Sequence, residues 1–144
     1  MIIQATEKEL SQGVLLGNQF SKESKFVRFN ADIVIENVKN LIKNNIGVLF
    51  FAHADFELIG MICGIKYPDF LTGSLTAMEL FWFVDKRKRG VGLKLLIKFE
   101  SWARKENCKS IIMTHLSDSM PEEVKTIYEK KGYQYLESHY IKEL

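Results

Sequence analysis

Two absences narrow the class of protein that this sequence encodes: it has few cysteines and no long apolar segment. Its 144 residues include only Cys63 and Cys108, whose separation fits no metal-binding pattern. We therefore expect two reduced thiols in a cytoplasmic protein without a metal site. No apolar run reaches the ~18 residues that a transmembrane helix needs, and the first residues lack the charged flank of a signal peptide. The sequence thus predicts no membrane partner.

A strong charge of one sign is also absent. The 20 Lys and Arg residues against 18 Asp and Glu residues give a net charge of +2, which is too small to favour nucleic acid as a partner. The positive charge is nevertheless clustered, most densely over residues 86–89. The length suits one hydrophobic core, and no linker, repeat or low-complexity stretch interrupts it. We therefore expect a single domain over residues 1–144.

A basic loop with two glycines lies between a run typical of a strand and a run typical of a helix. The first run is Leu-Phe-Trp-Phe-Val at residues 80–84, and the second covers residues 93–105. A strand that turns into a helix leaves backbone N–H groups free at the positive end of the helix dipole, where they bind phosphate groups. Gly90 and Gly92 let the backbone approach such an anion closely. The loop therefore predicts a phosphate-bearing cofactor.

Two familiar phosphate-binding loops fit the sequence poorly. A P-loop ends in Gly-Lys-Ser/Thr, whereas Gly92 is followed by Leu93 and Lys94 and so offers no hydroxyl for Mg²⁺. A dinucleotide-binding Gly-x-Gly-x-x-Gly/Ala motif needs a small residue where this chain has Leu95. Such a motif also usually belongs to the first strand–helix unit of its chain, and this loop lies past residue 85.

The remaining pattern is Arg/Gln-x-x-Gly-x-Gly/Ala, which Arg87, Gly90 and Gly92 fill. Farther along, residues 127–133 read Ile-Tyr-Glu-Lys-Lys-Gly-Tyr, and the spacing leaves room for a helix, a strand and the start of another helix. With these two motifs the chain resembles the GNAT superfamily, the acetyl-CoA-dependent N-acetyltransferases. The order of elements extends the resemblance to essentially the whole chain, although only residues 79–133 carry specific motifs.

Hydrophobic periodicity and this resemblance together predict the fold. The expected class is α/β (α+β): a GNAT-like mixed, mostly antiparallel sheet flanked by helices on both faces, with a splayed central strand pair. Helices are expected at residues 6–18, between Asn30 and Asn44, and at 90–106 and 121–131. Strands are expected at residues 2–5, 47–54, 58–66, 74–84, 109–115 and 133–141. The splay is expected between the strands at 74–84 and 109–115.

The resemblance implies that acetyl-CoA binds in this splay as a co-substrate. Backbone groups of Phe83 and Val84 are then expected to hold the acetyl and pantetheine portion, and the basic loop the pyrophosphate. The loop residues assigned to the cofactor are Arg87, Lys88, Arg89, Gly90, Val91, Gly92 and Leu93. Many members have an asparagine where this chain has Pro121, and Ser117 or Ser119 is expected to replace that contact.

Acetyl transfer to an amine requires a base, because an amine of pKa near 10.4 is protonated at neutral pH. Glu79 lies in an otherwise apolar run, and the resemblance implies that it is this base, acting through a water. Tyr128 is the implied acid that protonates the departing thiolate. The alternatives are a solvated or salt-bridged Glu79, a Tyr128 that only packs at the surface, and His115 as the base. Neither cysteine lies in a nucleophile motif, so direct attack is expected.

The acceptor is expected to be an amine-bearing small molecule or a protein amine, bound near the first two helices and residues 67–73. Two other functions compete with this enzyme. One is a catalytically inert CoA-binding regulatory module with a GNAT fold, and the other is a nucleic-acid-binding protein that uses the basic run from Lys86 to Arg89. The last strand, at residues 133–141, is the expected contact of a homodimer.

Overall fold

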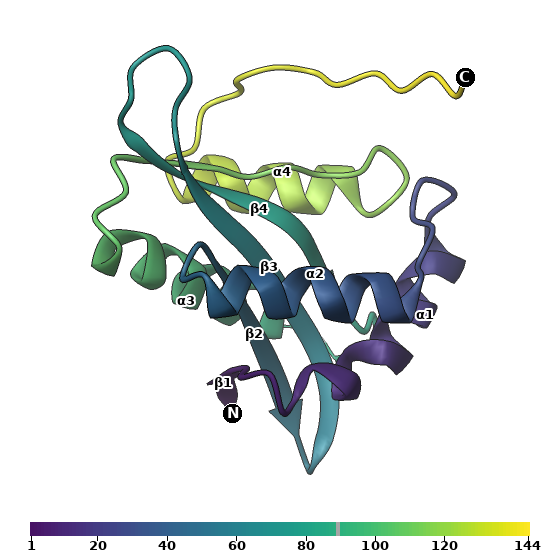
Figure 1. Ribbon diagram of the computed structural model, residues 1–144. Coiled ribbons are helices and arrows are strands. Elements are labelled where there is room, and N and C mark those ends of the chain that lie inside the picture. The colour runs from purple at the N-terminus through teal and green to yellow at the C-terminus, as the bar shows by residue number, and fades with distance from the viewer. Residues whose placement is uncertain (89) are drawn as a thin grey trace. The chain divides into compact units, whose positions relative to one another are not determined.

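The computed structural model describes residues 1–88 and 90–144, so the predicted cofactor residue Arg89 lies outside the described residues. The chain forms two compact units, 1–114 and 115–144, which are described one at a time (Figure 1). The first unit holds a five-stranded sheet with its helices, and the second holds the last helix. No helix in the described ranges is both long and apolar enough to cross a membrane.

The sheet of the first unit has the order β1-β2-β3-β4-β5, so strands that follow one another in sequence are neighbours. The strands are β1 (Ile2–Gln4), β2 (Gly47–Ala54), β3 (Glu57–Pro68), β4 (Leu75–Val84) and β5 (Ser110–Ile112). All pairs are antiparallel except β4 with β5, which is parallel. A parallel pair needs a crossover, and α3 (Val91–Lys105) supplies it. The predicted mixed, mostly antiparallel sheet is confirmed.

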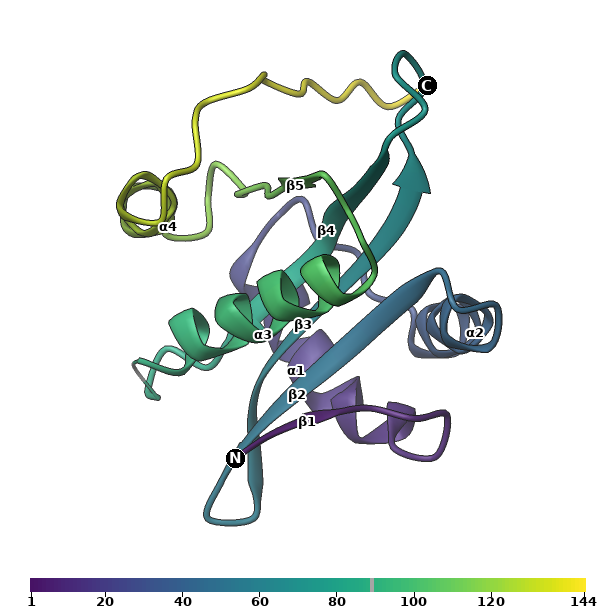
Figure 2. The ribbon, with the colours of Figure 1, turned by 90° about the vertical axis from the view of Figure 1, so that its left-hand side faces the viewer.

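Helices pack on both faces of this sheet, as predicted. On one face lies α2 (Ala31–Lys43), which approaches so closely that a Cβ on Gly47 would lie 2.7 Å from Leu41 Cβ. On the other face lies α3, because a Cβ on Gly64 would lie 2.4 Å from the Phe99 ring. Figure 2 shows α2 and α3 on opposite sides of the strands. The two glycines therefore allow the layers to approach each other.

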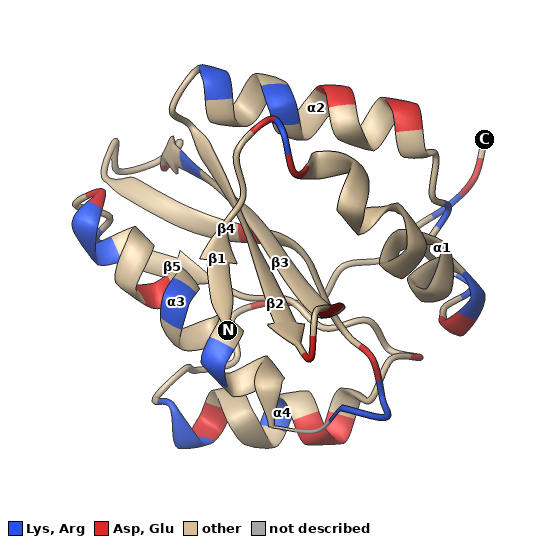
Figure 3. Ribbon diagram, turned by 90° about the horizontal axis from the view of Figure 1, so that it is seen from below, with Lys and Arg blue, Asp and Glu red and all other residues tan. Residues whose placement is uncertain are grey.

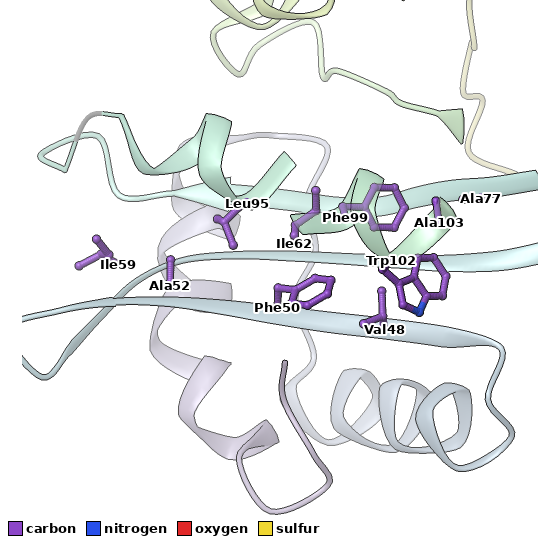
Figure 4. Packing of buried hydrophobic residues seen from close by; sticks show 10 residues of the cluster. All are labelled: Val48, Phe50, Ala52, Ile59, Ile62, Ala77, Leu95, Phe99, Trp102 and Ala103. Atoms are coloured by element: carbon purple, nitrogen blue, oxygen red, sulfur yellow. The ribbon is translucent and has the colours of Figure 1, made fainter. Parts of the chain in front are cut away.

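The main core lies between the sheet and α3. Its members are Val48, Phe50, Ala52, Ile59, Ile62, Ala77, Leu95, Phe99, Trp102 and Ala103 (Figure 4). Every second residue of β2 from Val48 to Ala52 belongs to it, as strand alternation requires. Phe99 and Trp102 stack with 5.5 Å between ring centroids. Because burying a large apolar side chain stabilises by ~1.5–3 kcal/mol, this core fixes the position of α3 on the strands.

The predicted helix after Asn30 is confirmed as α2. The Asn30 side chain accepts a hydrogen bond from the Ile33 N–H at 3.2 Å, as an N-cap residue does. The helix ends at Lys43, before the two asparagines that the sequence marks as its stop. Its polar cap and its apolar spacing both indicate the same boundaries, which is why the sequence alone predicts them.

The first predicted helix, residues 6–18, is wrong in both boundaries. Thr6 and Glu9 do form a capping interaction, with 2.7 Å between Thr6 N and Glu9 Oε2, but it leads into a 3-10 turn (Leu10–Gly13). The α-helix proper is α1 (Val14–Glu23). It continues through Gly17, where a Cβ would lie 2.4 Å from the Phe29 ring. This tertiary contact outweighs the low helix propensity of glycine, and the sequence does not reveal it.

β4 and β5 separate after a short stretch of pairing, which confirms the predicted splay. Their parallel register ends at Met78 opposite Ile112, so among the described residues the rest of β4 pairs only with β3. On the β3 side the register shifts between Cys63 and Gly64, where β4 carries an extra residue next to Glu79. Such a bulge re-aims the side chains beside it.

Two other predicted strands differ in length from the observed ones. The strand predicted at 109–115 covers only β5, because its backbone moves away from β4 after Ile112. The strand predicted at 58–66 is longer and continues to Pro68, so the connecting loop begins at Asp69 rather than at 67. Asp69 N donates to Ser74 O at 2.8 Å and closes that loop. The turn chemistry of the aspartate therefore outweighs the turn signal of the proline.

The second unit consists of α4 (Pro121–Lys130) and the segments on either side of it. Pro121 lies in the first turn, and Gly132, with a φ of 86°, follows the end of the helix, as the sequence predicts. The strand predicted at 133–141 is wrong, because residues 133–144 form no helix or strand. A strand is stable only with a hydrogen-bonded partner, and Tyr133 instead packs on Tyr128 with 5.4 Å between ring centroids.

Candidate active site

Glu79 is a buried carboxylic acid at the point where β4 and β5 separate. It follows Met78, the last β4 residue that pairs with β5, and is only 4% exposed. The N–H and the hydroxyl of Thr114, two residues beyond β5, donate to Glu79 Oε2 at 3.1 and 2.7 Å. The carboxylate thus bridges the two strands where their own hydrogen bonds have ended. A solvated or salt-bridged Glu79, the alternative left open by the sequence, is not what the structure shows.

This environment brings the titration of Glu79 close to neutral pH. Burial raises the pKa of Glu79 to about 7, and the two hydrogen bonds from Thr114 counteract part of that rise. The neighbouring Cys63 thiol on β3 is also buried, and burial together with the charge of Glu79 raises its pKa, so it stays protonated. A buried carboxyl group that titrates near neutrality is suited to accept a proton and release it again.

The backbone N–H and C=O groups of Val84 face the side of β4 where β5 no longer pairs. Asp85 N donates to Ile59 O at 2.9 Å, and the register continues with Val84 opposite Gly60 and Phe83 opposite Met61. In an antiparallel ladder alternate residues direct their N–H and C=O groups to the partner strand. Phe83 therefore bonds toward β3, as Asp85 does, whereas Val84 faces the side that β5 has left. This corrects the predicted backbone role of Phe83, whose side chain stacks on Phe20 with 4.8 Å between centroids.

The basic loop is held to the end of β4 by Asp85. The buried carboxylate of Asp85 accepts hydrogen bonds from the Arg87 backbone N–H at 3.0 Å and from the Arg87 guanidinium at 2.5 to 3.1 Å. Lys88 N donates to Asp85 O at 2.8 Å and closes a turn. The bonds from Arg87 lower the pKa of Asp85 to about 2. The predicted anion-binding side chain of Arg87 thus points back to the chain's own carboxylate.

The neighbouring lysines also have acidic partners. Lys86 Nζ lies 3.1 Å from Glu23 Oε2 of α1, and Lys88 Nζ lies 3.8 Å from Glu57 Oε2 of β3. Figure 3 colours the Lys and Arg positions of the ribbon blue and the Asp and Glu positions red. Both lysine side chains stay partly exposed, at 56% and 37%. Exposed pairs of this kind are weak, so the lysines can exchange their partners for an incoming anion.

The helix that follows the loop presents its N-terminus. Gly90 has a φ of 86° and is the N-cap of α3, which begins at Val91. The first four N–H groups of a helix have no partner within it, and here they belong to residues 90–93. A Cβ on Gly90 would meet nothing within 4 Å, whereas one on Gly92 would lie 3.2 Å from the Trp82 ring. Gly90 thus provides open space in front of the helix, and Gly92 allows α3 to pack against β4.

The remaining predicted catalytic residues belong to the second unit. Tyr128 lies on α4, is 8% exposed and packs against Tyr133. His115, the alternative base, is exposed at the start of this unit, and Ser119 N donates to Leu116 O at 3.1 Å in the segment before α4. The roles predicted for these residues stay predictions.

Comparison with known proteins identifies the family. The model of the acetyltransferase (GNAT) family matches residues 18–133. Among solved structures, a ribosomal-protein-alanine N-acetyltransferase from Brucella melitensis biovar Abortus 2308 aligns with a TM-score of 0.75 and 16% identity over 100% of this chain and 99% of that one. An aminoglycoside antibiotic 6′-N-acetyltransferase from Acinetobacter haemolyticus aligns with a TM-score of 0.75 and 18% identity over 100% and 99%.

A further solved structure carries the co-substrate. It is a predicted acetyltransferase from Clostridium acetobutylicum with acetyl-CoA, and it aligns with a TM-score of 0.76 and 18% identity over 99% of this chain and 95% of that one. A sequence search of curated proteins found no match. At these identities the solved structures show a common fold. The family match covers most of the chain, which therefore belongs to the GNAT acetyltransferases and is an enzyme of that class.

Two residues of the site were missed from the sequence, Thr114 and Asp85. Thr114 lies in a stretch read as strand, and its contact with Glu79 depends on the early end of β5. No local pattern signals that end. The sequence does carry a signal for Asp85: an arginine two positions after an acidic residue at the end of a strand can bond to that carboxylate.

Proposed function

We propose that this protein transfers the acetyl group of acetyl-CoA to a primary amine by direct attack, as one GNAT acetyltransferase domain over residues 1–144. The observation that carries the proposal is Glu79, a buried carboxyl group with a pKa of about 7 beside the open edge of β4. A general base must have a pKa near the working pH and must lie in reach of the reacting group. Glu79 meets the first condition, and its position where β4 and β5 separate supports the second.

Acetyl-CoA supplies an acetyl thioester, and three features of this chain fit it. Val84 directs backbone N–H and C=O groups to the open side of β4, which suits the amides of an extended pantetheine arm. The N–H groups of residues 90–93 suit the diphosphate. The open space around Gly90 leaves room for that group. We propose that the positive charges of Lys88 and Arg89 attract the diphosphate. Arg87 is proposed to contribute indirectly, by neutralising the carboxylate of Asp85.

Glu79 removes the proton of the acceptor amine in this proposal. At neutral pH freeing the lone pair of an amine with a pKa near 10.4 costs about 4–5 kcal/mol, so a base in the site is required. The carboxylate is fixed by Thr114 on Oε2, and we propose that it takes the proton through a water. Tyr128 is proposed as the acid for the thiolate, a role supported by its position in the Tyr-Glu-Lys motif.

The acceptor is proposed to be an amine-bearing small molecule or a protein amine. Solved structures of similar fold include proteins described as aminoglycoside and ribosomal-protein-alanine acetyltransferases, which cover both kinds. The competing nucleic-acid function is disfavoured, because the net charge is only +2 and the Arg87 guanidinium is bonded to Asp85. A cytoplasmic location stays part of the proposal. A homodimer through residues 133–141 stays part of it as well, although these residues form no strand within the single chain.

Calorimetric titration of acetyl-CoA, followed by release of the CoA thiol with a panel of amines, tests this function. Wild-type protein is expected to bind acetyl-CoA and to acetylate at least one class of amine. Glu79→Gln keeps an oxygen that accepts from Thr114 but loses the base, so binding should persist while turnover falls by about 10²–10⁴-fold. Binding without any turnover on the whole panel would support the inert regulatory module instead.

A further inference from the structure

Past their last backbone pair, a contact between the Glu79 carboxylate and Thr114 joins the two strands that enclose the proposed site. Parallel pairing ends at Met78 opposite Ile112. Immediately beyond it, Thr114 donates its N–H and its hydroxyl to Glu79. Among the described residues both donors contact the same oxygen, Oε2. An oxygen that already accepts two hydrogen bonds is the poorer site for a proton, so Oε1 is the oxygen that takes it.

We propose that Thr114 is the positioning residue of the proposed base: it fixes the Glu79 carboxylate, directs the incoming proton to Oε1 and favours the ionised form. This inference rests on the proposed function for its catalytic meaning, but the hydrogen bonds themselves can be tested without turnover. The backbone N–H of Thr114 remains in any side-chain variant. The hydroxyl is the removable part, and at 2.7 Å it is the shorter of the two bonds.

The chemistry around Glu79 makes this hydroxyl important. Burial favours the neutral acid, and among the described residues the two bonds from Thr114 oppose it. The titratable neighbour across the sheet is the Cys63 thiol of β3, which stays neutral because its pKa is raised by burial and by Glu79 itself. Around this carboxyl the described residues supply no cation that would compensate for a lost donor. Removing the hydroxyl should therefore move Glu79 further toward its neutral form.

The test is the titration of Glu79 followed by NMR of ¹³C-labelled glutamate side chains, with the resonance assigned by its loss in Glu79→Gln. Thr114→Val removes the hydroxyl at an exposed residue, so the fold should tolerate it. In this variant we expect the midpoint of the Glu79 titration to rise by about one pH unit, since a hydrogen bond to a charged group is lost. Thr114→Ser restores a hydroxyl and should return the midpoint to the wild-type value.

A matched control is Thr76→Val. Thr76 also forms a hydroxyl bond across β4 and β5, to Ser110 at 2.9 Å, but within the paired part of the strands. The same chemical change there should leave the Glu79 midpoint unchanged. An equal midpoint in wild type and Thr114→Val would overturn the inference, as would an equal rise in Thr76→Val.

Kinetics then separate this inference from the proposed function. If Glu79 is the base, Thr114→Val should lower kcat about tenfold at pH values below the midpoint of the wild-type profile. At higher pH its kcat should recover, and its KM for acetyl-CoA should be unchanged at every pH. His115→Gln serves as the background for this profile, because His115 is the alternative candidate for the base and follows Thr114 directly in the sequence. Full activity of Glu79→Gln would refute the proposed function. A shifted kcat profile without a shifted NMR midpoint would refute the role of Thr114.

Discussion

The carboxylate of Asp85 is bonded by both the backbone and the side chain of Arg87, although only Lys86 separates the two residues. Asp85 is anchored in turn to β3 through its own N–H and Ile59 O. The chain from Asp85 to Lys88 is therefore held at the end of β4 by contacts within the chain. Arg87 also neutralises a carboxylate that would otherwise repel a phosphate group. Its contribution to anion binding is then indirect.

A double-mutant cycle tests this indirect role. Arg87→Ala leaves the Asp85 charge without its guanidinium partner, although the backbone N–H of residue 87 and the Gln19 side chain still bond to it, so acetyl-CoA affinity should fall by about tenfold or more. Asp85→Asn alone should have a smaller effect, because the amide oxygen can still accept the Arg87 N–H. With Asp85→Asn added to Arg87→Ala, calorimetry should show most of the affinity restored. If the double variant binds as weakly as Arg87→Ala, Arg87 contacts the cofactor directly and the indirect account is wrong.

Two glycines with similar positive φ values allow an effect on cofactor binding to be distinguished from an effect on stability. Gly90 and Gly73 have φ values of 86° and 71°, and a Cβ on either would meet nothing within 4 Å. Replacement of each by alanine should cost a similar ~1–2 kcal/mol of unfolding free energy, because both lie in the left-handed region. Only Gly90→Ala should weaken acetyl-CoA binding, since its methyl group enters the space in front of α3.

Thermal or urea unfolding measures whether the two glycine variants lose a similar unfolding free energy. Calorimetry measures whether only Gly90→Ala binds acetyl-CoA more weakly. Gly73 lies in the loop between β3 and β4, away from the helix N-terminus. Equal loss of affinity in Gly73→Ala would show that binding follows overall stability rather than the proposed anion site.

Glu79 should make stability depend on pH in a specific direction. Its pKa is about 7 in the folded protein, above its ordinary value of 4.5, so between these values the folded state binds more protons than the unfolded state. Stability from this group is therefore complete at low pH and is lost as pH rises through the window. Glu79→Gln cannot titrate, and its unfolding free energy should exceed the wild-type value increasingly, by up to about 3 kcal/mol near neutral pH.

Urea unfolding of wild type and Glu79→Gln at matched pH values measures this difference, and the other carboxylates cancel between the two proteins. A difference that stays constant from about pH 4 to about pH 8 would mean that Glu79 has an ordinary pKa in the folded protein. The proposed base would then lack its main support.

The sequence predicts the elements whose signals are local. Asn30 defines the start of α2 because its cap and the apolar spacing after it agree. The glycine loop and the run before it place the end of β4 and the start of α3 within one residue. Both signals reflect requirements of the backbone itself, which a single sequence carries.

The features that the sequence misses depend on contacts between distant segments. The extension of α1 to Glu23 follows packing of Phe29 on Gly17. The contact of Thr114 with Glu79 spans 35 positions and exists only because β5 stops early. Residues 133–141 have strand-like composition, but composition does not supply a partner strand. Long-range pairing therefore accounts for these errors.

The most direct test of the account is the pH dependence of acetyl transfer by wild type and Glu79→Gln at saturating acetyl-CoA, on an amine that the panel identifies. The account predicts that wild-type kcat rises with pH through a midpoint near the Glu79 pKa of about 7. It also predicts that Glu79→Gln binds acetyl-CoA with unchanged affinity, loses this midpoint and turns over about 10²–10⁴-fold more slowly. The same midpoint and a comparable kcat in both proteins would contradict it.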